Sequence, residues 1–312
     1  MSARQKFNDP HWTARGERRA VVPMGAMRTV WFNTGSLCNI ECANCYMESS
    51  PTHDALQYIS RAEARMFLDE IKGADWPVQE IGFTGGEPFL NPDMAGMAWD
   101  ALTGGWRVLI LTNAMRPLMR PRVQADVEAL AEEFGDRLTF RVGLDHFTEA
   151  RHNAERGAGA WAEALRGANW LAALPSRLAL AGRYDADEAP EAAREGYRQL
   201  IKTMGWSIDV DDPERLSLFP EMRADDAPPE ITEACWEILG VSPSSVMCSS
   251  SRMIVKPKGA AAPRVRPCTL LPYSDAFDLG ETLAGSLEPT PLNHPYCATF
   301  CVLGGASCSA AT

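Results

Sequence analysis

The sequence predicts an α/β fold built from parallel strands that alternate with helices. Short runs of β-forming residues recur between residues 28 and 220, and a helical segment follows most of them. Residues 107–112 are apolar almost throughout, which is typical of a parallel strand buried on both faces. Alternation of this kind implies parallel βαβ units. Six such units fit a partial barrel, a closed barrel or an open sheet.

The individual elements follow from local patterns. Strands are expected at residues 29–34, 80–84, 107–112, 138–144, 178–181 and 216–219, with residues 207–210 as the alternative for the sixth. Ser60 opens the first helix, and Glu63 at its third position completes the capping-box pattern. Further helices are expected from residue 92, at 123–134, at 148–174 with a break near 157–159, and at 190–204.

The composition divides the chain into three parts. Residues 1–27 are polar and basic without a clear period and predict an N-terminal arm, whereas residues 28–220 carry the alternating units. Residues 221–312 form a C-terminal extension rich in Pro, Gly and Ser, in which two β-like runs around 257–259 predict a hairpin. Before the hairpin we expect a short helix whose apolar face is formed by Ile231, Cys235, Ile238 and Leu239.

Composition also narrows the classes of function. The 312 residues carry a net charge of −11, whereas a surface that follows nucleic-acid phosphates needs a basic excess. No apolar run is long enough to span a membrane. The first residues lack the apolar segment of a secretory signal, so we expect a cytoplasmic location. Nucleic acid and membranes are therefore not expected as partners.

The nine cysteines are many for a reducing compartment, and their odd number argues against full pairing in disulfides. They form two groups. The first group shares one short loop and comprises Cys38, Cys42 and Cys45. The second group lies in the last quarter of the chain and comprises Cys235, Cys248, Cys268, Cys297, Cys301 and Cys308. Two separate groups of thiols indicate two metal centres.

The first thiol group has the spacing Cys38-x3-Cys42-x2-Cys45 and follows the first predicted strand. The carboxyl ends of strands are where βα proteins place their chemistry. Three thiolates on a tight loop can hold three corners of a [4Fe–4S] cluster and leave the fourth iron open to a substrate or cofactor. The alternative is a structural zinc site with His53 as the fourth ligand.

The second predicted strand ends in Thr84-Gly85-Gly86-Glu87-Pro88. Two glycines let the backbone approach a ligand closely, and Glu87 adds a carboxylate that can meet an ammonium group. Because this segment follows the thiol loop by one βα unit, both are expected at the same edge of the sheet. Their combination favours the iron–sulfur interpretation over zinc.

With these motifs the sequence resembles the radical S-adenosylmethionine (SAM) superfamily. The shared pieces are the thiol loop CNIECANC, the GGEP segment, Thr112-Asn113, Gly143-Leu144-Asp145-His146 and HNAERG at 152–157. The resemblance covers about residues 29–220 and implies a partial (β/α)6 barrel. It also implies a [4Fe–4S] cluster that binds SAM and cleaves it, with one electron, to a 5′-deoxyadenosyl radical that abstracts a hydrogen atom from a substrate.

The resemblance implies roles for individual residues. The cluster ligands would be Cys38, Cys42 and Cys45. The amino group of SAM would meet Gly85, Gly86, Glu87 and the adjoining Pro88. The ribose of SAM would meet Asn113 and Asp145. Asn113 and Asp145 have strand-end capping as their alternative role. Arg183 would either meet the SAM carboxylate or lie at the surface. The family usually has an aromatic residue before the third cysteine, where this chain has Asn44, with Tyr46 after the cysteine.

The second thiol group resembles the C-terminal extensions called twitch or SPASM, which hold auxiliary [4Fe–4S] clusters. A full SPASM domain has more thiols, so the five cysteines from Cys248 onward fit one cluster with one cysteine to spare. The expected ligands are Cys248, Cys268, Cys297 and Cys301. A zinc ion held by four thiolates is the alternative, because both metals accept such a set.

Two residues are candidates for a catalytic role. Cys308 is the spare cysteine, and it either returns a hydrogen atom to the substrate, as in radical epimerases, or is a small buried hydrophobic residue. His146 follows the fourth predicted strand, where it takes part either in proton transfer or only in local hydrogen bonding.

The sequence therefore predicts a radical SAM enzyme that acts on a small molecule or a peptide and leads to oxidation or to carbon–sulfur or carbon–carbon bond formation. An electron donor such as flavodoxin or ferredoxin is the expected partner. The alternatives are a radical epimerase with a cysteine hydrogen donor and a non-catalytic zinc-binding protein.

Overall fold

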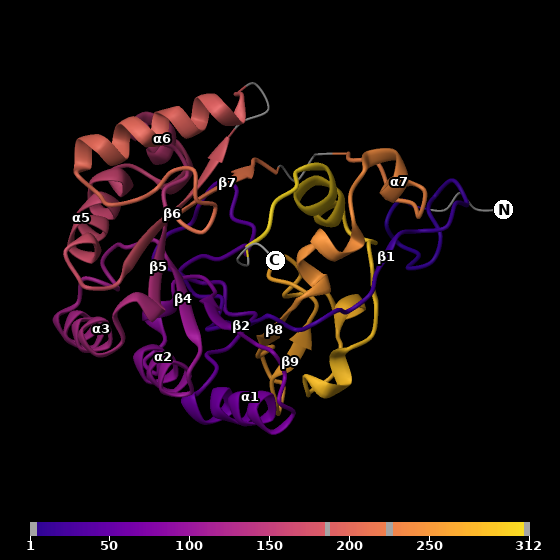
Figure 1. Ribbon diagram of the computed structural model, residues 1–312, viewed down its shortest axis with the longest axis horizontal. Helices are drawn as coiled ribbons and strands as arrows, with labels where there is room; N and C mark the ends of the chain where they lie inside the picture. Colours follow the sequence, from indigo (N-terminus) through magenta and orange to yellow (C-terminus); the bar gives the residue numbers. More distant parts are fainter. Residues whose placement is uncertain (1–4, 185–187, 223–226, 309–312) are drawn as a thin grey trace.

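A mostly parallel sheet of eight strands forms the centre of the protein in the computed structural model, which describes residues 5–184, 188–222 and 227–308. Six strands lie side by side in chain order (Figure 1): β2 (Thr29–Asn33), β3 (Glu80–Thr84), β4 (Arg107–Thr112), β5 (Leu138–Gly143), β6 (Arg177–Tyr184) and β7 (Leu216–Pro220). Within the described residues the two end strands of the sheet do not pair with each other. The predicted partial (β/α)6 barrel is confirmed.

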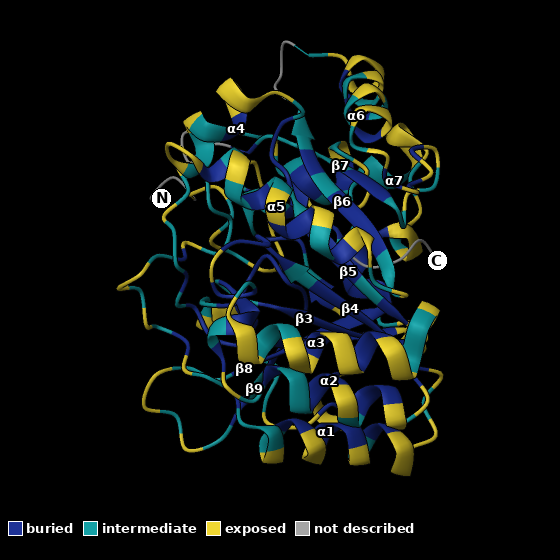
Figure 2. Cartoon of the chain, turned by 90° about the vertical axis from the view of Figure 1, so that its left-hand side faces the viewer, coloured by how far each residue is buried: buried dark blue, intermediate teal, exposed yellow. Residues whose placement is uncertain are grey.

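Helices cover the outer face of this sheet (Figures 1 and 2). They are α1 (Arg61–Gly73), α2 (Met94–Thr103), α3 (Pro121–Phe134), α4 (Glu149–Arg156), α5 (Ala160–Ala172) and α6 (Pro190–Met204). In α1, for example, Phe67, Leu68 and Ile71 are buried in the core that the helices share with the sheet. The predicted break between α4 and α5 is confirmed, and Gly157 (φ 98°) and Gly159 (φ 80°) supply the positive φ values that other residues adopt at a cost.

The capping box at the start of α1 is also confirmed. The Ser60 hydroxyl accepts a hydrogen bond from the Glu63 backbone N–H (3.3 Å), and the Glu63 carboxylate accepts one from the Ser60 N–H (2.9 Å). We expect Ser60→Ala to lower the free energy of unfolding by about 1 kcal/mol, the usual value of an N-cap side chain. Urea denaturation measures this change. Ser60→Thr keeps an N-cap hydroxyl and is expected to stay near the wild-type value, so an equal loss in both variants would contradict the capping argument.

The C-terminal extension contributes two strands to the same sheet. β8 (Ser251–Val255) lies parallel to β2 with Thr29 opposite Ser251, and β9 (Arg264–Arg266) lies antiparallel to β8. The predicted hairpin is therefore present, and its first strand extends the barrel. Trp31, Leu109, Met253 and Val255 form a small core of their own, separate from the core under the helices.

The arm and the rest of the extension pack together. β1 (Val21–Val22) pairs with β10 (Thr290–Pro291), and the buried guanidinium of Arg19 lies 2.5 Å from the Glu230 carboxylate. The apolar face predicted around Cys235 is wrong in part, because α7 (Cys235–Leu239) is short and Ile238 is 76% exposed. The remaining elements are the short 3₁₀ segments Pro88–Leu90, Gly135–Arg137, Pro243–Ser245, Met247–Ser249, Asp275–Phe277 and Ala284–Ser286, and the π-helical turn Cys297–Leu303.

Among the described helices, none combines the length and the apolar character needed to cross a membrane.

Candidate active site

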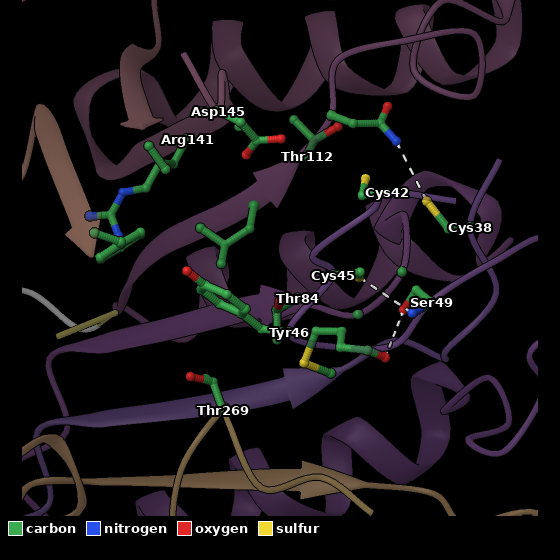
Figure 3. Close-up of a pocket in the computed structure, with 18 of the residues that line it drawn as sticks. Cys38, Cys42, Cys45, Tyr46, Ser49, Thr84, Thr112, Arg141, Asp145 and Thr269 are labelled. Atoms are coloured by element: carbon green, nitrogen blue, oxygen red, sulfur yellow. Dashed lines mark hydrogen bonds between the residues drawn. The ribbon is translucent and has the colours of Figure 1, made fainter. Parts of the chain in front are cut away.

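A cavity at the carboxyl ends of the parallel strands brings together most of the predicted site residues. The thiol loop, the glycines after β3 and the ends of β4, β5 and β6 line it, together with residues 269–270 and 308 of the extension (Figure 3). The predicted residues that line it are Cys38, Cys42, Cys45, Gly85, Gly86, Asn113, Asp145, Arg183 and Cys308. Residues far apart in the sequence therefore share one site, as the βα architecture requires.

The thiols of the loop receive N–H donors from the protein. Asn113 Nδ2 lies 3.7 Å from Cys38 Sγ, and the backbone N–H of Ser49 lies 3.3 Å from Cys45 Sγ. Burial raises the pKa of Cys38 to about 12 and that of Cys42 to about 11, so both thiols keep their protons until a metal displaces them. N–H groups directed at sulfur stabilise thiolate ligands, and this arrangement suits a bound cluster.

The backbone that follows β3, beginning with Gly85 and Gly86, packs directly against the backbone that leads into the thiol loop. Gly86 N–H donates to the Gly35 carbonyl (2.9 Å), and Glu87 N–H donates to the Leu37 carbonyl (3.1 Å). A Cβ atom on Gly86 would lie 2.1 Å from the Leu37 oxygen, and one on Gly85 would lie 2.5 Å from the Gly35 oxygen. Glycine is thus needed here because the loop backbone itself approaches so closely.

Glu87 and Pro88 are buried but do not line the cavity in the described structure. The Glu87 carboxylate accepts hydrogen bonds from the backbone N–H of Asn113 (2.9 Å), the hydroxyl of Thr112 (2.9 Å) and the backbone N–H of Phe89 (3.2 Å). Burial raises its pKa to about 7. Glu87 therefore fixes the backbone at the end of β4. In this way it also positions Asn113, whose side-chain amide reaches Cys38.

Asp145 is held between two guanidinium groups. Arg156 Nε lies 2.6 Å from one carboxylate oxygen, and Arg183 Nε lies 3.4 Å from the other. Although Asp145 is buried, these cations keep the pKa of its carboxyl well below the usual range. Arg183 also pairs with Glu221 at 3.3 Å. Its side chain is only 14% exposed, so the prediction of a surface arginine is wrong.

The loop residue before the third cysteine has a different partner. The Asn44 amide donates to the Glu155 carboxylate of α4 (3.2 Å). The aromatic side chain on this loop is Tyr46, which lines the cavity, lies 4.4 Å from the Arg183 guanidinium and donates to the Pro220 carbonyl (2.8 Å). Tyr46 therefore supplies aromatic surface from the position that follows Cys45.

His146 lies beside the cavity but is not among the described residues that line it. Its Nδ1 accepts a hydrogen bond from the Thr148 backbone N–H (3.0 Å), and its ring stacks on Phe147 with 4.0 Å between centroids. Its Nε2 lies 3.5 Å from the Glu188 carboxylate, so this candidate joins the start of α4 to the segment before α6.

The later thiols lie in the core of the extension. Cys248, Cys268 and Cys297 are buried, and Cys301 and Cys308 pack against them. Burial raises the pKa of Cys268, and the neighbouring thiols of Cys297 and Cys248 raise it further, so these groups are close to one another. Among the described residues, no three His, Cys, Asp or Glu side chains form a group that fits a single metal ion.

Sequence reasoning missed two arginines of this site. Arg156 lies within the HNAERG segment, but nothing local shows that it pairs with Asp145, the residue two after the end of β5. Arg141 stands inside β5 and lines the cavity. An arginine inside an otherwise apolar strand is the pattern that would have pointed to it, because charged residues are rarely buried without a partner.

Residues 32–195, just over half of the chain, match the family model of the Radical SAM superfamily. The chain therefore belongs to the radical SAM superfamily. Enzymes of this superfamily use a [4Fe–4S] cluster together with SAM. The three thiols on one cavity, the N–H donors at their sulfurs and the glycine backbone beneath the loop fit these cofactors.

Two relatives illustrate the range of this similarity. The chain is 29% identical over 148 residues to AdoMet-dependent heme synthase of Methanosarcina barkeri, covering 47% of this chain and 40% of that protein. It is 30% identical over 163 residues to mycofactocin maturase MftC of Mycobacterium ulcerans, covering 52% of this chain and 39% of that protein. The chain thus spans about two fifths of the length of these curated relatives.

The fold is similar to that of Streptococcus suis SuiB in its crystal structure with the precursor peptide SuiA. The TM-score is 0.61 at 10% sequence identity, and the match covers 90% of this chain and 71% of SuiB. Because this match covers most of the chain, the likeness in fold includes more than the barrel.

Proposed function

We propose that this protein is a radical SAM enzyme that abstracts a hydrogen atom from a substrate bound in the cavity at the carboxyl ends of its strands. The observation that carries the proposal is the convergence of Cys38, Cys42 and Cys45 with Gly85 and Gly86 on that cavity. The three cysteines would hold the cluster. When bound, the cluster and SAM supply a 5′-deoxyadenosyl radical as the hydrogen-abstracting species.

The protein's own residues prepare this site. Asn113 and the Ser49 N–H donate to the sulfurs of Cys38 and Cys45, which orients two of the three thiols. Gly85, Gly86, Asn113 and Asp145 are the residues we assign to SAM. Asp145 already pairs with two arginines, so it would stay ionised and would not exchange protons with a substrate. Its role would be to hold the side chains of this wall of the cavity in place.

The extension would hold an auxiliary [4Fe–4S] cluster of the twitch or SPASM type on Cys248, Cys268, Cys297 and Cys301. Support comes from the burial of these thiols in one core and from their mutual influence on pKa. Such a cluster favours oxidation or bond formation, because it can accept an electron from the product radical. It would lie beside the cavity, since Cys308 packs against that core and lines the cavity as well.

A radical epimerase is the second candidate. The observation that favours it is the position of Cys308, whose residue lines the same cavity as the three cluster thiols. A thiol in that position can return a hydrogen atom to a substrate radical. Deuterium incorporation from heavy water into an otherwise unchanged product would distinguish this reaction from oxidation or bond formation.

The substrate is a small molecule or a peptide, and the reductant is a flavodoxin or ferredoxin. A peptide is supported by the similarity to a mycofactocin maturase and to SuiB, which was crystallised with a precursor peptide. A small molecule is supported by the similarity to a heme synthase.

The test is anaerobic reconstitution with iron and sulfide, followed by addition of dithionite and SAM and chromatography for 5′-deoxyadenosine. The matched control is the Cys38/Cys42/Cys45→Ala variant. We expect 5′-deoxyadenosine from the wild type only, while the variant keeps about four irons, the content of one remaining cubane. A wild-type protein that binds zinc and leaves SAM intact would overturn the proposal. If the variant retains no iron, the proposal of an auxiliary cluster is wrong, while the proposal of SAM cleavage still stands.

A further inference from the structure

Arg141 is a buried cation on the wall of the cavity. It stands in β5, is 4% exposed and lines the cavity together with Gly143 two residues later. Alternate residues of a strand face the same side, so Arg141 and Gly143 both face the inside of the barrel. Figure 3 shows Arg141 on one side of the pocket and Cys38, Cys42 and Cys45 on the opposite side, with Tyr46 between them.

The hydrogen bonds of Arg141 are incomplete in the described part of the chain. One terminal nitrogen, Nη1, donates to the Cys308 carbonyl (2.9 Å), while Nε is buried without a partner. Within the same described residues no carboxylate lies at ion-pairing distance from this guanidinium. Glu80 and Glu214 influence the charge of Arg141 electrostatically from a greater distance. Both carboxylates also lie near another cation, because Arg107 is 3.9 Å from Glu80 and 3.5 Å from Glu214.

The other arginines of the cavity differ in this respect. Arg156 and Arg183 both pair with Asp145, and Arg183 pairs with Glu221 as well. Burial of a charge without an ion-pair partner is costly, so a guanidinium that lines a cavity with no carboxylate beside it among the described residues indicates an anionic ligand. The planar guanidinium with its five N–H groups matches a carboxylate, which it can bind through two parallel hydrogen bonds.

We propose, on the basis of the function above, that Arg141 binds a carboxylate of the substrate. The substrate is then a carboxylate-bearing small molecule or a peptide that presents a carboxylate to this wall of the cavity. SAM also carries a carboxylate, but Arg141 lies two residues before Gly143 on β5 and across the pocket from the thiols. A strand advances about 3.3 Å per residue, so Arg141 lies about 7 Å deeper than the strand end.

The experiment uses the reconstituted wild-type protein saturated with SAM, and isothermal titration calorimetry with two probes. N-acetylglycine carries a carboxylate, and N-acetylglycinamide is its uncharged counterpart. We expect the wild type to bind the acid and not the amide. Arg141→Gln should weaken binding of the acid roughly tenfold or more, as loss of charged hydrogen bonds does. Arg116→Gln removes the same charge from a side chain that is 81% exposed and should bind like the wild type.

Three results would overturn the proposal: no binding of the acid to the wild type, equal binding of the acid and the amide, or unchanged binding of the acid to Arg141→Gln. The first two need no variant, so they hold even if Arg141→Gln fails to fold. If Arg141→Gln loses affinity for SAM but not for the acid, the carboxylate belongs to SAM and the substrate assignment is wrong. Failure of the proposed function is seen separately, as a wild-type protein that forms no 5′-deoxyadenosine from SAM.

Discussion

Replacing Gly86 with alanine is expected to abolish the cluster held by Cys38, Cys42 and Cys45. The added methyl group would lie 2.1 Å from the Leu37 oxygen and 2.7 Å from the Ser36 oxygen. Both obstacles are backbone atoms of the thiol loop, so the loop has to move as a whole and the thiols lose their common geometry. We expect the reconstituted variant to lack about four irons per chain and the absorbance that belongs to them.

The control for this variant is Gly73→Ala, because a Cβ atom at Gly73 meets nothing within 4 Å. It should bind as much iron as the wild type. A Gly86→Ala protein that also keeps its full iron content and forms 5′-deoxyadenosine would show that the loop can shift without loss of the site. The close packing of the thiol loop against Gly86 would then not be needed for cluster binding.

Asp145→Asn is expected to cause the second large effect, a loss of stability. The carboxylate pairs with two largely buried guanidinium groups, Arg156 at 2.6 Å and Arg183 at 3.4 Å. Asparagine keeps the shape and removes the charge, so two cations remain with less compensation. Breaking a buried pair in this way typically lowers the free energy of unfolding by about 3–5 kcal/mol. Urea denaturation of the protein without cofactors measures it.

A surface pair serves as the comparison for Asp145. The Asp54 carboxylate lies 2.5 Å from Lys258 Nζ, but both side chains are more than half exposed. Water screens such a pair, so Asp54→Asn should unfold at the wild-type urea concentration. If Asp145→Asn did so too, the two arginines would have found other partners, and Asp145 would not be the centre of this charge network.

Local patterns in the sequence were sufficient for the parallel strands and for the position of the thiol loop, whereas the partial barrel followed from the resemblance to the superfamily. Each of the six parallel strands and the capping box at Ser60 depends on a few neighbouring residues, and the thiol loop and glycines fall at strand ends, which meet at one edge. Arg156 and Asp145 belong to the same βα unit, but their contact depends on how α4 turns back over the end of β5. The partners of Arg183 and Glu87 could not be predicted, because they come from other βα units. The same holds for the pairing of β8 with β2, which no spacing along the chain reveals.

That pairing has a consequence for how the molecule assembles. During synthesis, β2 leaves the ribosome early, but the strand that covers one of its edges begins only at Ser251. Until then β2 offers unpaired N–H and C=O groups to any other strand. Contacts so distant along the chain form slowly, and exposed edges favour aggregation in the meantime. A fragment that stops at residue 220 would keep β2 as an open edge, so we expect it to self-associate more readily than the chain that includes β8.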